Sequence, residues 1–163
     1  MMEMKRIDVS ALSDTQILAL LEVAQGFSAA LPNWSRLRGR LEAGEAWAFC
    51  DGATLAGFAL VDTAAPHLDG AAQLTMLRYR WEYNSEATLL WMLTALAQTY
   101  RSRFRYLLLD VNGRHELNLE LYRRFGFQNS ILRSPRGGEN IILLADLTGL
   151  KTGQGGEKER FSP

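Results

Sequence analysis

Hydrophobic periodicity along this chain changes repeatedly between the twofold repeat of a strand and the 3.6-residue repeat of a helix. Four helices are expected: one opening at 13–16, one at 33–44, one at 84–102 and one ending at Phe125. Strands are expected over 5–9, 46–50, 54–61, 73–83, 106–111, 127–132 and 140–147. The resulting order, β-α-α-β-β-β-α-β-α-β-β, predicts a mixed α/β fold.

Local stop and start signals support these boundaries. Ser13 and Gln16 have the spacing of a capping box, which satisfies the free amides at a helix start. Asp51-Gly52 favours a tight hairpin turn between two β-prone runs. Gly126 follows Phe125 where a helix needs a residue with a left-handed backbone.

Length and charge exclude several classes of protein. The 163 residues suit a single domain, expected over 1–149, and the glycine-rich, charged segment 150–163 is expected to be a disordered tail. Eighteen basic and eighteen acidic side chains give a net charge of zero, so neither nucleic acid nor a membrane surface is an expected partner. The single cysteine, Cys50, excludes an intramolecular disulfide.

The N-terminus contains no long apolar run, so we expect neither a secretory signal nor a membrane span, and a cytoplasmic location. Met1, Met2 and Met4 leave the start codon ambiguous. The two histidines, His67 and His115, lack the spacing of zinc ligands, so no metal site is expected.

The segment from Leu107 to Phe127 carries the most specific motif of the chain, Leu-Tyr-Arg-Arg-Phe-Gly-Phe over 121–127. This motif resembles the LY-x-x-x-GF pattern of the GCN5-related N-acetyltransferase (GNAT) family, and the element order resembles that family too over about residues 4–147. The resemblance implies a mostly antiparallel, twisted central sheet of about seven strands flanked by about four helices.

The resemblance also implies an activity, an acyl-CoA-dependent N-acetyltransferase. Acetyl-CoA would be the co-substrate, and a small-molecule or protein amine would attack it directly in a ternary complex. By position, Tyr122 would be the catalytic acid. The residues expected to contact the cofactor are Met76, Leu77, Ser85, Glu86, Ala87, His115 and Tyr122.

The chain departs from the family pattern at two places. The missing glycines of the first motivate an alternative to the leading hypothesis, a catalytically inactive GNAT-like module for ligand binding or protein interaction. The segment 81–86 lies where family members have a glycine-rich pyrophosphate loop, but it contains no glycine, and Glu82 and Glu86 would oppose a phosphate. The preferred interpretation of these side chains is structural: Asn84 caps a helix and Glu86 favours its dipole. His115 stands where the family commonly has an asparagine.

The chemistry needs a polarised carbonyl, a base for the amine and an acid for the leaving thiolate. A backbone amide near Leu77 is the candidate for the carbonyl. The candidates for the base are Glu82, Asp110, His67 and His115, with water as a further option. Arg78, Arg80 and Arg123 are candidates for compensating the acidic loop. The acceptor and the oligomeric state, a homodimer included, stay open.

Overall fold

A single seven-stranded sheet organises the part of the chain that this computed structural model describes, residues 1–26, 32–64 and 68–149. Its strands are β1 (Met2–Arg6), β2 (Glu45–Asp51), β3 (Thr54–Asp62), β4 (Ala71–Tyr79), β5 (Tyr106–Asn112), β6 (Gln128–Arg133) and β7 (Asn140–Asp146). They are ordered β1-β2-β3-β4-β5-β7-β6, and only β4 and β5 run parallel. The predicted mixed, mostly antiparallel fold is therefore confirmed.

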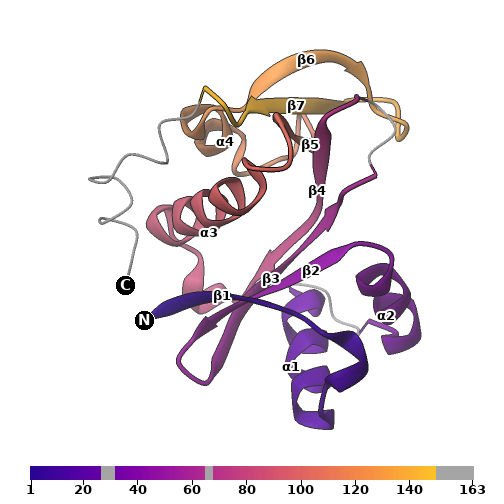
Figure 1. Cartoon of the computed structure of the whole chain (residues 1–163), viewed down its shortest axis with the longest axis vertical. Coiled ribbons are helices and arrows are strands. Elements are labelled where there is room, and N and C mark those ends of the chain that lie inside the picture. The colour runs from indigo at the N-terminus through magenta and orange to yellow at the C-terminus, as the bar shows by residue number, and fades with distance from the viewer. Residues whose placement is uncertain (27–31, 65–67, 150–163) are drawn as a thin grey trace.

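Helices cover both faces of this sheet (Figure 1). They are α1 (Asp14–Gln25), α2 (Trp34–Glu42), α3 (Glu86–Tyr100) and α4 (Leu119–Phe125), with short 3₁₀ turns η1 (Val9–Ala11) and η2 (Trp81–Tyr83). In Figure 1, α1 and α2 lie on one side of the strands and α3 and α4 on the other. Among the described residues, no helix has the length and apolar character needed to cross a bilayer.

The two faces of the sheet bury separate hydrophobic clusters. On the side of α1 and α2, Leu20 and Leu41 pack with Phe58 and Met76 of the sheet. On the other side, α3 buries seven of its fifteen residues, and its Leu93 and Leu96 belong to one cluster with residues of β5 and β7. Because strand residues alternate between faces, neighbours along β4 contribute to different clusters.

The predicted caps are present. Ser13 and Gln16 form both hydrogen bonds of a capping box at the start of α1. Gly52 has a φ of 61° in the β2–β3 turn. Gly126 ends α4 with a φ of 133°, and the amide of Phe127 donates to the carbonyl of Tyr122 across the helix end.

Two expected strand boundaries are wrong. The strand expected at 5–9 spans Met2–Arg6, because the Asp8 carboxylate accepts from the Ser10 amide and nucleates η1. The strand expected to reach residue 83 ends at Tyr79, because the chain turns into η2. The predicted tail at 150–163 lies outside the described residues.

Candidate active site

The parallel strands β4 and β5 diverge in the middle of the sheet. Their pairing runs from Ala71 opposite Tyr106 to Leu74 opposite Leu109 and stops there. At this point β4 contains a β-bulge: Leu74 and Met76 pair with consecutive residues of β3, so Thr75 is the extra residue. A bulge bends its strand, and here it accompanies the separation of β4 from β5.

A cleft of about 480 Å³ opens where the strands separate. Its walls come from the second half of β4, the end of β5, the C-terminal end of α1 and the segment that leads into α4. The polar side chains among its lining residues are Gln25, Thr75, Arg78, Tyr79, Asn84, Asp110, Glu116, Asn118 and Tyr122. Such a cavity has the size of a typical small-molecule site.

Tyr122 projects from α4 into the wall of this cleft and is 5% exposed. Its ring packs edge-on against Phe127, with centroids 6.0 Å apart. Burial raises the pKa of Tyr122 well above the ordinary value, the charges of Glu116 and Tyr79 raise it further, and a hydrogen bond with Asn118 lowers it in part. Tyr122 is therefore a protonated donor at neutral pH.

Three polar residues surround Tyr122 that sequence reasoning did not assign to the site. The Asn118 side-chain amide donates to the Tyr79 hydroxyl at 3.0 Å, and the Glu116 carboxylate accepts from the Asn118 backbone N–H at 3.1 Å. The alternation of side chains along a strand could have identified Tyr79, because it lies two residues after Leu77 and so shares a strand face with it. Nothing in the local pattern distinguishes Glu116 from an ordinary acidic residue near a helix start.

The residues predicted to contact the cofactor fall into two groups. Met76, Leu77 and Tyr122 line the cleft together. Ser85, Glu86 and Ala87 lie at the start of α3, outside the lining. There the Ser85 hydroxyl accepts from the Thr88 amide, and Glu86 forms an ion pair with Arg124 of α4 at 2.6 Å.

The loop from β4 to α3 uses most of its own backbone donors. The amides of Tyr83, Asn84 and Ser85 donate to carbonyls within the loop at 2.9 Å each, and the Ser85 side chain takes the amide of Thr88. In the first turn of α3, the amides of Glu86 and Ala87 have no protein acceptor among the described residues, as expected at a helix start. The cap of α3 is Ser85, so the expectation that Asn84 caps this helix is wrong.

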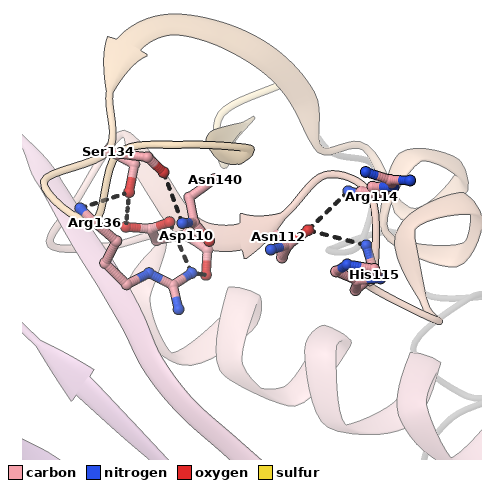
Figure 2. A network of polar contacts seen from close by, with 8 residues as sticks. Asp110, Asn112, Arg114, His115, Ser134, Arg136 and Asn140 are labelled. Atoms are coloured by element: carbon pink, nitrogen blue, oxygen red, sulfur yellow. Dashed lines mark hydrogen bonds and ion pairs between the residues drawn. The ribbon is translucent and has the colours of Figure 1, made fainter.

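His115 does not reach the cleft. Its side chain is exposed, and its backbone amide, like that of Arg114, donates to the Asn112 side chain in the turn after β5 (Figure 2). Of the four residues named as candidate bases, Asp110 alone lines the cleft. Glu82 lies exposed in η2, and His67 lies outside the described residues.

The carboxylate of Asp110 is already engaged on both oxygens. The Ser134 hydroxyl donates to one oxygen at 2.7 Å, and the Arg136 guanidinium donates to the other at 2.9 Å (Figure 2). Arg136 also donates to the backbone carbonyl of Asp110. These bonds join β5 to the turn between β6 and β7 at the edge of the cleft.

Two of the three arginines expected to compensate the acidic loop are bound elsewhere. Arg80 donates to the carbonyl of Leu55 at 2.7 Å and to Glu22 at 3.2 Å, and Arg123 donates to Asn129. Arg78 lies at the cleft, where its guanidinium donates to the backbone carbonyl of Leu77 at 3.1 Å. The arginine that meets the acidic loop is Arg124, through its pair with Glu86.

Comparison with solved structures finds acetyltransferases across nearly the whole length of the chain. Neither a protein-family model nor a curated protein sequence matches it. The ribosomal-protein-S18-alanine N-acetyltransferase from Escherichia coli is similar at 18% identity and a TM-score of 0.69, over 90% of this chain and 94% of that one. A GNAT family acetyltransferase from Elizabethkingia anophelis, solved with acetyl-CoA bound, is similar at 11% identity and a TM-score of 0.64, over 89% and 97%.

An aminoglycoside 6'-acetyltransferase type Ii is similar at 15% identity and a TM-score of 0.68, again over 89% of this chain and 97% of that one. These identities are too low to carry a substrate from one protein to another, but the agreement in fold extends over about nine-tenths of the chain. Together with the divergence of β4 and β5 at a bulge, it establishes that the chain has the fold of the GCN5-related N-acetyltransferases.

Proposed function

We propose that the protein is an N-acetyltransferase that moves an acetyl group from acetyl-CoA to an amine in a ternary complex. The observation that carries this proposal is the cleft between β4 and β5, with the buried Tyr122 on its wall. The amine nitrogen attacks the thioester carbonyl, the C–N bond forms and the C–S bond breaks. A proton leaves the amine, and one is supplied to the departing thiolate.

The free edge of β4 suits the pantetheine arm of the donor. Beyond Leu74 this edge faces β5 without pairing to it, so its backbone groups can meet the amides of an extended ligand. The exception is the Leu77 carbonyl, which accepts from the Arg78 guanidinium at 3.1 Å. An extended peptide-like group can add to an exposed strand edge in the same way. A backbone N–H near Leu77 is our candidate for polarising the thioester carbonyl.

Tyr122 is our candidate for the group that donates a hydrogen bond to the leaving sulfur. A free phenol and a free thiol differ by about 1.5 pKa units, or roughly 2 kcal/mol. Burial raises the pKa of Tyr122 and so increases this difference. Burial also raises the pKa of the thiol that leaves beside Tyr122, so the difference between the two pKa values becomes smaller again.

Glu116 is the better candidate for the base of the two carboxylates at the cleft. Both oxygens of Asp110 accept hydrogen bonds, whereas Glu116 uses one oxygen for the Asn118 amide. Its other oxygen has no protein donor among the described residues. Glu116 also lies close enough to Tyr122 and Arg78 to shift the pKa of both.

The site fits the two ends of acetyl-CoA unequally. The cleft accepts the acyl and pantetheine groups, but the pyrophosphate would meet only the amides of Glu86 and Ala87, next to two acidic side chains. The ion pair with Arg124 offsets the charge of Glu86 in part. We therefore expect the nucleotide to add little affinity.

This misfit supports the alternative function, an inactive module that keeps the fold and binds another ligand or a protein. The two functions differ in whether acetyl-CoA binds. The test is a thermal-shift titration of the protein with acetyl-CoA and CoA, followed by an acetyl-transfer assay over a panel of amines. Ligand at about 100 times its dissociation constant adds roughly 2.7 kcal/mol.

A saturable rise of several degrees followed by turnover of any amine would support the enzyme. No shift at millimolar acetyl-CoA, together with no turnover, would exclude it and leave the inactive module.

A further inference from the structure

A second, smaller pocket adjoins the cleft on the side of α1 and α2. Its volume is about 240 Å³, which is enough for an acidic group and some water. It shares Ala24, Met76 and Arg78 with the lining of the cleft, so the two spaces are neighbours. Arg36 and Arg40 of α2 complete its charged lining.

The three arginines of this pocket have no acidic partner. Arg36 and Arg40 lie one helical turn apart on α2, and neither they nor Arg78 form an ion pair with any described carboxylate. Their sequence neighbours do: Arg38 pairs with Glu42 at 3.0 Å, and Arg80 pairs with Glu22 at 3.2 Å. The guanidinium groups that line the pocket are therefore free of described carboxylates, while arginines two residues away along the chain are paired.

The cations of this pocket repel one another. Burial lowers the pKa of Arg78, and the nearby charge of Arg40 lowers it further, while Tyr122 and Glu116 act in the opposite direction. The pocket extends along α2 from the N-cap Asn33 to Arg40 in the last turn, and only its Asn33 end lies at the positive end of the helix dipole. An anion placed here would add to the attraction that Glu116 exerts on Arg78 and would relieve the repulsion between Arg40 and Arg78.

We propose that this pocket binds an acidic group of the acceptor, so that the preferred acceptor is a small amine that also carries a carboxylate or a phosphate. The inference rests on the proposed function, because it assigns the acceptor side of the same cleft. Arg78 lines both the pocket and the cleft. An acceptor whose acidic group binds Arg78 in the pocket can therefore extend into the cleft toward Tyr122. Arginine suits this role because its planar fork binds either acid through two parallel hydrogen bonds.

Matched acceptors test the proposal. Initial rates are measured at saturating acetyl-CoA for two pairs, phosphoethanolamine against ethanolamine and β-alanine against β-alaninamide. In one of the two pairs, we expect kcat/KM to be at least about tenfold higher for the acidic amine than for its neutral partner. The pair that shows this difference indicates whether the pocket prefers phosphate or carboxylate. Arg40→Gln should lower kcat/KM for that acceptor by about 10- to 100-fold, mainly through KM, and leave the neutral amine unchanged.

Arg38→Gln is the matched control, because Arg38 lies on the same helix but pairs with Glu42 outside the pocket. Equal kcat/KM for acidic and neutral acceptors, with Arg40→Gln behaving like Arg38→Gln, would overturn the proposal.

Calorimetric titration with inorganic phosphate and with acetate, without acetyl-CoA, separates this proposal from the proposed function. Binding that Arg40→Gln weakens and Arg38→Gln does not would support the anion site even if the protein transfers no acetyl group. The absence of any such binding, in a protein that acetylates neutral amines, would leave the enzyme intact and refute the anion site.

Discussion

Burial is the main cause of a raised pKa at two tyrosines, Tyr100 and Tyr122, but the two side chains have different roles. The hydroxyl of Tyr100 donates to Glu45 and accepts from the Trp47 indole, both at 2.7 Å, and lies outside the cleft. Tyr122 lines the cleft and faces Glu116 and Asn118. A shifted pKa therefore does not identify a catalytic group here, and the cleft makes the distinction.

Replacing each hydroxyl separately tests this distinction. Tyr122→Phe should lower kcat by about 100-fold or more with little change in stability, because the donor to the leaving sulfur is lost. Tyr100→Phe should lower the free energy of unfolding by about 1–3 kcal/mol, because Trp47 loses its acceptor, and should leave kcat unchanged. Steady-state kinetics and urea unfolding measure both effects. Unchanged kcat in Tyr122→Phe at saturating substrate would remove its proposed role.

Glu45 predicts part of the pH dependence of stability. The Arg103 guanidinium binds both oxygens of this carboxylate and, against the effect of burial, lowers its pKa, with Tyr100 and Arg6 adding to the shift. As pH falls below about 5, the unfolded chain takes up this proton before the folded protein does. The contribution of Glu45 is therefore complete above that pH and is lost as pH falls through its folded-state pKa.

The variant Arg103→Gln should be less stable than the parent at pH 7, and the difference should shrink as pH falls toward 3. Urea unfolding at several pH values measures it. A difference that stays constant with pH would mean that Arg103 acts through packing on Tyr100 and Phe104, over whose rings it lies.

At the scale of elements, the β4–α3 loop differs most from what a nucleotide needs. Its 3₁₀ turn consumes amides that a glycine-rich loop would leave for a phosphate, and the Tyr83 hydroxyl anchors it by donating to Asp51 at 2.9 Å. The double variant Glu82→Gly/Asn84→Gly should therefore tighten CoA binding, by about tenfold if one charge-assisted bond is gained. Calorimetry against CoA and against pantetheine measures it, and the affinity for pantetheine should not change. No gain for CoA would mean that this loop does not meet the pyrophosphate.

The contact between β3 and β4 depends on a glycine. A Cβ on Gly57 would lie 2.5 Å from the carbonyl oxygen of Arg78 and 3.1 Å from the Tyr79 side chain, both on the strand that forms the cleft. Gly57→Ala should therefore cost about 1–3 kcal/mol of unfolding free energy. Gly39→Ala, in the open interior of α2, should instead stabilise by about 0.5–1 kcal/mol, because alanine favours the helix. Urea unfolding of both variants checks the opposite signs, and equal signs would refute the packing argument.

At the scale of the whole molecule, one sheet joins the helix pairs on its two faces, and its strands are most fully hydrogen-bonded at its centre. β5 pairs with β7 along its full length and with β4 up to Leu109, whereas β6 lies at an edge and pairs with β7 at only three positions. Native-state hydrogen exchange should therefore be slowest at 107–109 and faster throughout β6. Equal protection in β6 would mean that another surface covers that edge.

The same contrast of scales explains which predictions succeeded. Element types and order were predictable because caps and hydrophobic repeats act within a few residues, as Ser13 and Gly126 do. The end of β4 was predicted four residues too late, because Trp81 and Tyr83 are residue types that favour strands and yet lie in the 3₁₀ turn η2. Met76, Leu77 and Tyr122 were predicted for the site and do line the cleft, whereas His115 was predicted and lies outside it.

By itself, then, the amino-acid sequence determined the succession of helices and strands and, through the motif over 121–127, the family whose fold they build. The tertiary structure alone decided which side chains meet. The bulge at Thr75 separates β4 from β5 and brings Tyr79, Glu116 and Asn118 around Tyr122, and the packing of α2 sets its arginines beside Arg78. The physical reason is that the contacts of Tyr79 with Asn118 and of the α2 arginines with Arg78 join residues about 40 positions apart. The register and packing of the sheet bring these residues together, and no local pattern does.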